Sequence, residues 1–166
     1  ECLAAMQAAK ARFVVRAKHD RHVFDELGNK VRLFSAASAV SANEQRDAYL
    51  NARKKKGIPA ADKSHPPREA RMATLEFAST TVTFPRPKCA QKALPPTLTI
   101  NVVHVREPDP PEGVAPIEWV LLTSEPAEGK KKLLRVVDWD RARWTIEEFF
   151  KALKTGCQVE ARQLES

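Results

Sequence analysis

The sequence predicts an α/β fold with a β-rich block between two helical segments. Helix-forming residues fill positions 2–11, and short β-branched runs separated by prolines fill 70–124. Apolar residues recur at helical spacing within 141–154. With 166 residues, 43% of them hydrophobic, the chain is long enough for one soluble domain with a sizeable core.

The first segment predicts a helix followed by a strand. Residues 2–11 favour the end of a longer helix, and Phe13 to Val15 form an apolar run typical of a buried central strand. Basic side chains crowd the end of this strand: Arg16, Lys18, His19, Arg21 and His22. Since ligands bind at strand ends in open α/β sheets, we expect a site for a polyanion or else a solvated loop.

Residues 30–56 are less clearly patterned. Positions 30–40 fit either a strand or a short helix. Ser41 and Glu44 have the spacing of a capping box, which predicts a helix over 42–56 that ends at Gly57. The basic stretch from Arg53 to Arg71 fits a loop on a phosphate backbone, although a cationic last turn would also complement the helix dipole.

From residue 70 the pattern becomes β. Strands are predicted at 71–77, 80–84, 97–102 and 117–122, with Pro-rich breaks at 85–87, 95–96 and 108–111. Two successive helices are then expected at 127–138 and 141–154.

The overall charge favours a nucleic-acid partner. The net charge is +7 and the pI is near 9.5. Cys2, Cys89 and Cys157 are widely spaced and form no disulfide framework, which indicates a reducing cytosol. No apolar run approaches the length of a membrane span, so no membrane partner is expected.

The last predicted helix carries a mixed charged arc. Its apolar stripe consists of Ile146, Phe149, Phe150 and Leu153. An arc of roughly 80° beside that stripe holds the charged residues Asp140, Arg143, Glu147, Lys151 and Lys154. This arrangement suits a metal ion held by Glu147 and phosphates held by the bases. The alternative is an ordinary i,i+4 ion pair between Glu147 and Lys151.

Three sequence blocks resemble one protein family. They are RFVVRAKH at 12–19, WVLLTSEP at 119–126, and RWTIEEF at 143–149 followed by KTG at 154–156. Arg143, Glu147 and Lys154 have the spacing of the Y-x2-R-x3-E-x6-K signature. The chain thus resembles bacterial insertion-sequence transposases related to the Tn-five transposase, with Asp140 in place of the signature tyrosine.

This resemblance implies a partial RNase H-like core interrupted by an antiparallel β-sheet insertion. Residues 1–29 would hold the end of a helix and a core strand. Residues 30–126 would form the insertion, and 127–166 the C-terminal helices with the signature glutamate.

The family cuts DNA with two metal ions held by two aspartates and a glutamate. Glu147 matches the glutamate, as catalytic residue and metal ligand for Mg2+ or Mn2+. The two aspartates would precede Glu1 in the family layout, so we expect no cleavage by this chain alone. The expected DNA-binding residues are Arg143, Lys151, Lys154, Trp119, Arg16 and Lys18.

Trp119 matches the family's tryptophan that stacks on a flipped base, although its alternation with Leu121 also fits a core residue. The leading hypothesis is therefore part of a cut-and-paste DNA transposase of the bacterial cytoplasm. Its partners would be double-stranded DNA and either a second copy or a full-length transposase. Two alternatives stay open: a truncated or decayed remnant that binds DNA or a partner without cutting, and a generic basic nucleic-acid-binding domain.

Overall fold

The protein is an α/β fold built on one seven-stranded sheet. A computed structural model describes residues 2–53, 67–87 and 94–155. The strand order is β1-β7-β6-β5-β2-β3, with β4 also paired to β5, and every pairing of these strands is antiparallel. The strands are β1 (Val14–Arg16), β2 (His22–Phe24), β3 (Lys30–Arg32), β4 (Glu44–Leu50), β5 (Arg71–Pro85), β6 (Thr97–Arg106) and β7 (Glu118–Thr123), and the helices are α1 (Cys2–Ala8), α2 (Leu33–Ser38) and α4 (Lys130–Thr155).

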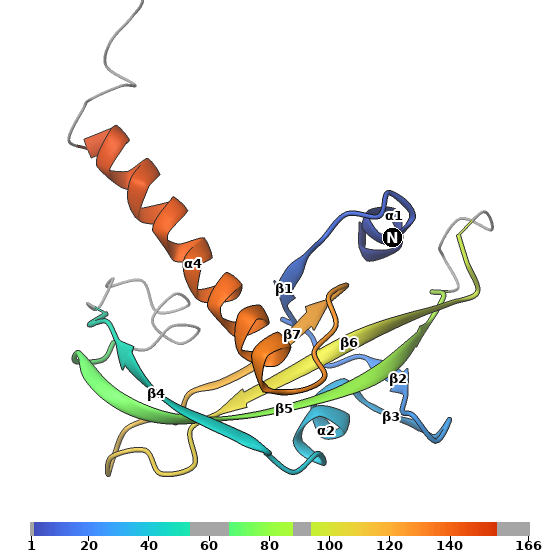
Figure 1. Ribbon diagram of the computed structural model, residues 1–166, viewed down its shortest axis with the longest axis horizontal. Coiled ribbons are helices and arrows are strands. Elements are labelled where there is room, and N and C mark those ends of the chain that lie inside the picture. Colours follow the sequence, from blue (N-terminus) through green and yellow to red (C-terminus); the bar gives the residue numbers. More distant parts are fainter. Residues whose placement is uncertain (1, 54–66, 88–93, 156–166) are drawn as a thin grey trace, which may run out of the picture.

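The two long central strands hold the sheet together (Figure 1). β5 and β6 pair continuously from Glu76 opposite Arg106 to Pro85 opposite Thr97. The predicted strands 71–77 and 80–84 are therefore one strand, because Ala78 and Ser79 continue the pairing. The predicted strands 97–102 and 117–122 correspond to β6 and β7.

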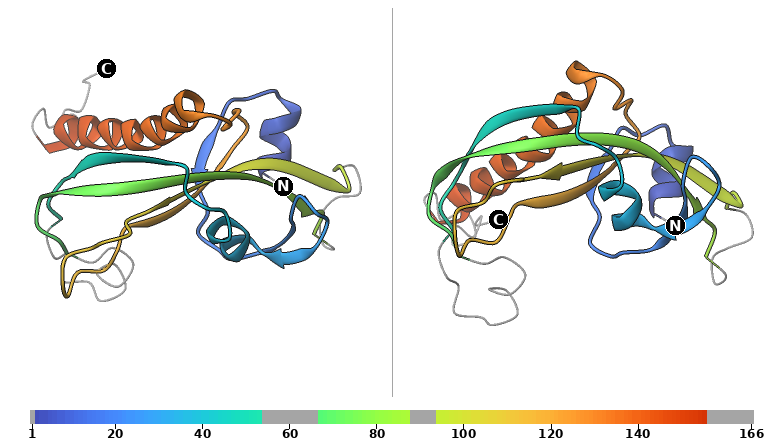
Figure 2. Two further views of the ribbon diagram at one scale, coloured as in Figure 1. Left: turned by 60° about the horizontal axis from the view of Figure 1, so that its bottom comes forward. Right: turned by 90° about the horizontal axis from the view of Figure 1, so that it is seen from below.

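Each face of the sheet has its own apolar core (Figure 2). Helix α4 covers one face, which we call the α4 face, and buries Leu133, Val136 and Val137 there. Helix α2 covers the opposite face, the α2 face, with Leu33 and Ala37. Apolar side chains on both faces explain why the central strands carry long runs of buried residues instead of clean alternation.

The helix predicted over 42–56 is wrong, because residues 44–50 form strand β4. The buried side chains there are Ala48 and Leu50, two residues apart, which is the period of a strand. All seven residues pair with β5. Two ion pairs tie β4 to α4: Arg46 Nη2 lies 2.6 Å from Asp138, and Lys130 Nζ lies 2.9 Å from Glu44. Pairing with β5 and these contacts outweigh the local capping signal.

The predicted buried central strand at 13–15 is also wrong. β1 stands at one end of the strand order, pairs with β7, and is half-buried along its length. Its β-branched residues predicted a strand correctly, but burial depended on which neighbours it acquired.

The ambiguous stretch 30–40 contains both expected elements. β3 is followed directly by α2. A tight turn connects β2 to β3, in which the Asp25 carboxylate accepts the backbone N–H groups of Leu27 and Asn29. Gly28 adopts φ +82°, the left-handed region that favours glycine.

The two helices predicted at 127–138 and 141–154 are one continuous helix, α4. Its first half packs through Leu133, Val136, Val137 and Asp140, at i, i+3, i+4 and i+7. In the second half of α4, the residues of the predicted apolar stripe are exposed: Ile146 by 58%, Phe149 by 60% and Phe150 by 54%. Nine residues separate Val137 from Ile146, roughly half a turn in helical phase, so the two apolar stripes face opposite sides.

The predicted division at residues 29 and 126 stays a prediction. Strands β1 and β2, from the first predicted segment, belong to the same sheet as β3 to β7. Helix α1 agrees with the helix expected at 2–11. None of the helices in the described ranges is long and apolar enough to cross a membrane.

We predict that the two halves of α4 contribute unequally to stability. Leu133→Ala removes a buried side chain and should lower the free energy of unfolding by about 2–5 kcal/mol. Ile146→Ala, in the exposed half, should change it by less than about 1 kcal/mol. Urea unfolding of both variants measures the difference, and equal losses would contradict this account of α4.

Candidate functional site

A guanidinium stacked on an indole marks the most distinctive site on the α4 face. The Cζ atom of Arg16, on β1, lies 4.2 Å from the ring centroid of Trp119, on β7. Trp119 is half-buried and packs against the core of the α4 face, so part of its surface stays accessible. We call these two residues the Arg16–Trp119 platform. Both ring faces and guanidinium planes can stack on nucleobases.

Helix α4 fixes the platform through Asp140. Arg16 Nε donates to both carboxylate oxygens, at 2.9 and 3.1 Å, and Arg16 Nη2 donates at 2.5 Å. The Asp140 side chain is 2% exposed. Because a buried carboxylate needs a partner, this ion pair holds the guanidinium against the indole.

Further arginines raise the positive potential beside the platform. Arg53 and Arg68 form an isolated antiparallel bridge, and Arg68 Nε donates to the backbone carbonyl of Asn51 at 2.9 Å. Burial lowers the pKa of Arg68, and the positive charges of Arg53, Arg71 and Arg16 lower it further. We call Arg53, Arg68 and Arg71 the arginine cluster. Converging cations of this kind suit a phosphate group.

One member of the cluster is neutralised within the fold. Arg71 binds Glu107, whose side chain is 2% exposed, through both carboxylate oxygens, one of them at 2.8 Å. Hydrogen bonding to Arg71 holds the pKa of Glu107 below its ordinary value, despite burial. Glu107 also accepts the Ile117 N–H at 3.1 Å, which fixes the start of β7 beside Trp119.

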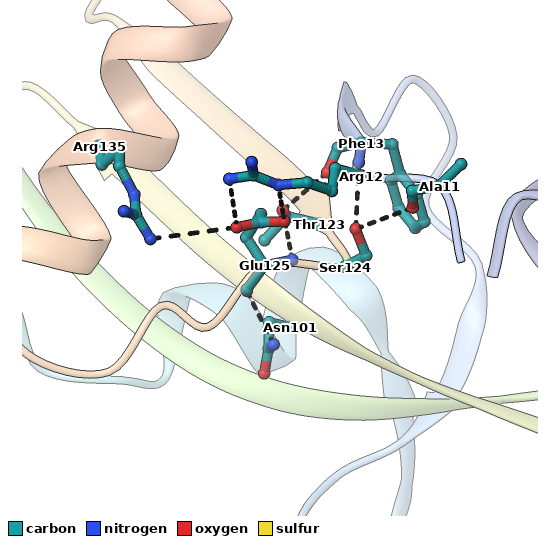
Figure 3. A network of polar contacts seen from close by, with 8 residues as sticks. All are labelled: Ala11, Arg12, Phe13, Asn101, Thr123, Ser124, Glu125 and Arg135. Carbon is teal, nitrogen blue, oxygen red and sulfur yellow. Dashed lines mark hydrogen bonds and ion pairs between the residues drawn. The ribbon is translucent and has the colours of Figure 1, made fainter.

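A second ion-pair network sets the position of β1, and thus of Arg16 (Figure 3). Arg12 binds both carboxylate oxygens of Glu125, at 2.6 and 2.9 Å, and Arg135 approaches the same group at 4.0 Å. Both guanidinium groups lie over the Trp139 ring, at 4.8 and 5.2 Å from its centroid. We call Arg12, Glu125, Arg135 and Trp139 the Glu125 clamp.

The clamp is reinforced by neutral hydrogen bonds. Thr123 Oγ1 donates to the Phe13 carbonyl at 2.7 Å, and the Phe13 N–H donates to Ser124 Oγ at 3.0 Å. Asn101 Nδ2 donates to the Glu125 carbonyl at 2.9 Å. These bonds join β6 and the residue that precedes β1 to the end of β7 and the segment that follows it.

The structure brings together some of the predicted DNA-binding residues. Arg16 and Trp119 are in contact, and Lys18 is exposed two residues beyond Arg16. Arg143 is exposed on α4, one turn beyond Asp140. The side chains of Glu147, Lys151 and Lys154 lie outside the described part of the protein, although α4 continues through all three positions.

The position of Glu147 can still be located along the helix. It lies seven residues beyond Asp140, about 10 Å along the axis and roughly in the same helical phase. Among the residues whose side chains are described, no group of three or more His, Cys, Asp or Glu could hold a metal ion. The described side chains therefore do not supply a complete metal-ligand set.

Sequence reasoning missed the partners of the site residues. Asp140 takes the place of the signature tyrosine, and the structure shows that its carboxylate binds Arg16. A signal was present, because Asp140 continues the buried spacing of Leu133, Val136 and Val137. No pattern in the sequence predicted that Arg71 would bind Glu107 or that Arg53 would pair with Arg68. No protein-family model matches this chain.

We predict that acid destabilises the protein through its lowered carboxylate pKa values. Hydrogen bonds from Arg12 and Arg71 lower the pKa of Glu125 and Glu107 respectively. Their stabilisation is therefore complete above the ordinary glutamate pKa of about 4.3 and is lost as the pH falls through the lowered folded values. Thermal unfolding at pH 7 down to pH 3 measures this loss.

Glu125→Gln should reduce the pH dependence of the melting temperature across that window. The matched control is Glu112→Gln, which changes an exposed glutamate in the segment between β6 and β7. An unchanged pH dependence in Glu125→Gln would contradict the role of the clamp.

Proposed function

We propose that the chain is part of a cut-and-paste DNA transposase and binds the transposon end through the α4 face. The single observation that carries this proposal is the Arg16–Trp119 platform, secured to α4 by Asp140. Both platform residues come from blocks that resemble the transposase family, although they are more than 100 positions apart in the chain.

The platform supports recognition of an unstacked base. The guanidinium of Arg16 covers part of the Trp119 ring, so an extruded base either displaces Arg16 or stacks on the guanidinium plane itself. In both cases Arg16 participates in recognition. Stacking of a base on an aromatic ring contributes roughly 1–3 kcal/mol, enough to offset much of the cost of unstacking it.

The arginine cluster supports binding of the DNA backbone. Arg68 lies close enough to Arg53, Arg71 and Arg16 for their charges to lower its pKa. A phosphate bound beside Arg68 would relieve that repulsion and release counterions from the DNA. Base and phosphate would thus be held by neighbouring parts of one face.

The exposed apolar stripe of α4 supports a larger catalytic domain. Ile146, Phe149 and Phe150 form a stripe on a helix side directed away from the buried stripe of its first half. A stripe of this kind is normally covered by another structural element. In the proposed transposase, the remaining strands of the RNase H-like core would cover it.

Catalysis requires more carboxylates than the described residues provide. By the resemblance, Glu147 would be one ligand of a pair of Mg2+ or Mn2+ ions, which activate water and stabilise the leaving oxygen when bound. Trp119, Arg16 and the arginine cluster would position the DNA strand relative to Glu147.

A DNA-binding remnant is the second candidate, and Asp140 favours it. The signature tyrosine of the family would donate a hydrogen bond to a phosphate, whereas Asp140 can only accept and is already bound to Arg16. With aspartate at this position, Arg16 forms an ion pair within the protein, although the resemblance assigns Arg16 to DNA binding. The remnant would retain DNA binding and lack cleavage.

We predict that the purified chain binds duplex DNA with strong salt dependence and does not cut it in Mg2+ or Mn2+. Fluorescence anisotropy between 50 and 300 mM salt measures binding, and a supercoiled plasmid reports cleavage. Several phosphate contacts should lower the affinity by about two orders of magnitude over this range. Cleavage that copurifies with the protein would contradict the claim that this chain alone lacks the metal ligands for cutting. Salt-independent binding would contradict the claim that the α4 face binds phosphates.

We predict that Trp119→Ala weakens binding to a duplex with an unpaired base by roughly fivefold to a hundredfold, because the stacking surface is lost. Binding to fully paired duplex should change less. Tyr49→Ala is the control, because Tyr49 is an exposed aromatic residue on β4 that belongs neither to the platform nor to the Glu125 clamp. Urea unfolding must show that both variants are folded. Equal effects of the two variants on binding to the duplex with an unpaired base would contradict the base-stacking role of Trp119.

A further inference from the structure

A cavity of about 550 Å³ opens on the α2 face, and Arg16 of the platform is among the residues that line it. Its lining comes from α1, β1, the loop that follows β1, the start of β2, and the adjoining ends of β5 and β6, with Leu33 of α2 and Leu122 of β7. This size is within the usual range for sites that enclose a small organic molecule.

The interior of the cavity is apolar. Its walls include side chains from five elements, which also form or border the core of the α2 face: Leu3, Met6, Val15, Phe84, Leu98 and Leu122. No Asp or Glu is among the described residues that line it. An apolar ligand body could therefore enter without burying an unpaired carboxylate of the protein.

Basic side chains border the same cavity. Lys18, His19, Arg21 and His22 are exposed and contribute to the lining, as does Arg86 at the end of β5. The nearby acidic residue of this loop, Asp20, is directed elsewhere, because its carboxylate accepts the Phe34 N–H at 3.0 Å and lies 3.9 Å from Arg32. The rim is therefore cationic, with apolar walls beneath it.

We propose that this cavity binds a small amphiphilic anion, an apolar chain that carries one carboxylate. The apolar chain of the ligand would fill the space between α1 and the ends of β5 and β6. Its carboxylate would lie among Lys18, Arg21 and the neighbouring basic residues. Charge complementarity selects an anion, and a cavity of about 550 Å³ with apolar walls selects a free molecule over the surface of a bilayer. This site adjoins Arg16 of the platform, but the proposal does not depend on the transposase hypothesis.

Calorimetric titration of the purified chain with monomeric laurate tests the proposal. Laurate should bind with one-to-one stoichiometry. Dodecyltrimethylammonium, with the same chain length and opposite charge, should bind at least about tenfold more weakly, and acetate should not bind measurably. Lys18→Gln with Arg21→Gln should weaken laurate binding roughly three- to tenfold, whereas Lys132→Gln, which removes a cation from α4, should not.

A pair of neighbouring substitutions on α1 tests the cavity itself. Ala4 lines the cavity and Ala5 is exposed. Ala4→Phe should fill the space and abolish laurate binding, while Ala5→Phe should leave it unchanged, with circular dichroism confirming that both variants are folded. DNA binding should be the same in both.

Several outcomes would overturn the proposal. Equal affinity for the cationic and anionic amphiphiles would contradict the claim that the basic rim selects an anion. Equal laurate binding by Ala4→Phe and Ala5→Phe would place the ligand elsewhere. Binding to phosphatidylglycerol vesicles without any binding of monomeric laurate would show a membrane-surface interaction instead of a ligand cavity.

Discussion

The buried carboxylate of Asp140 is the constraint on which the site depends. A charge with a side chain only 2% exposed must be compensated, and Arg16 compensates it with three short hydrogen-bond contacts. This pairing joins α4 to the edge strand β1 and holds the guanidinium over Trp119. Removing Arg16 would leave the buried Asp140 carboxylate without compensation.

The Glu125 clamp and the Arg71–Glu107 pair extend the same principle to the two ends of β7. Glu125 follows the end of β7 and binds Arg12, which precedes β1. Glu107 accepts the N–H of Ile117, the residue immediately before β7. Each carboxylate is largely buried and satisfied by an arginine. Trp119 therefore lies on a strand whose two ends are fixed by charge-assisted hydrogen bonds.

The two faces of the sheet have different chemical characters. On the α4 face, arginines are interleaved with buried carboxylates and a partly accessible tryptophan. On the α2 face, an apolar cavity is bordered by basic side chains that come from the loop after β1. Basic side chains thus occur on both faces of a protein whose net charge is +7.

Much of the secondary structure could be predicted from local sequence. The β-branched runs that became β5, β6 and β7, the Pro-rich breaks between them, and the helix formers of α1 act over a few residues. The candidate site was predictable in part, because Arg16 and Trp119 were selected from sequence blocks. Their contact was not, because more than 100 residues separate them.

The sequence by itself determined the β-rich character, the main strands and the basic charge, since these follow from local conformational preferences and composition. Only the tertiary structure decided that residues 44–50 form a strand, because pairing with β5 outweighs the capping signal. It also placed β1 at an edge and merged the C-terminal helices. The pairing of Asp140 with Arg16 was decided at this level too, because the cost of an uncompensated buried charge arises only once the chain has folded around it.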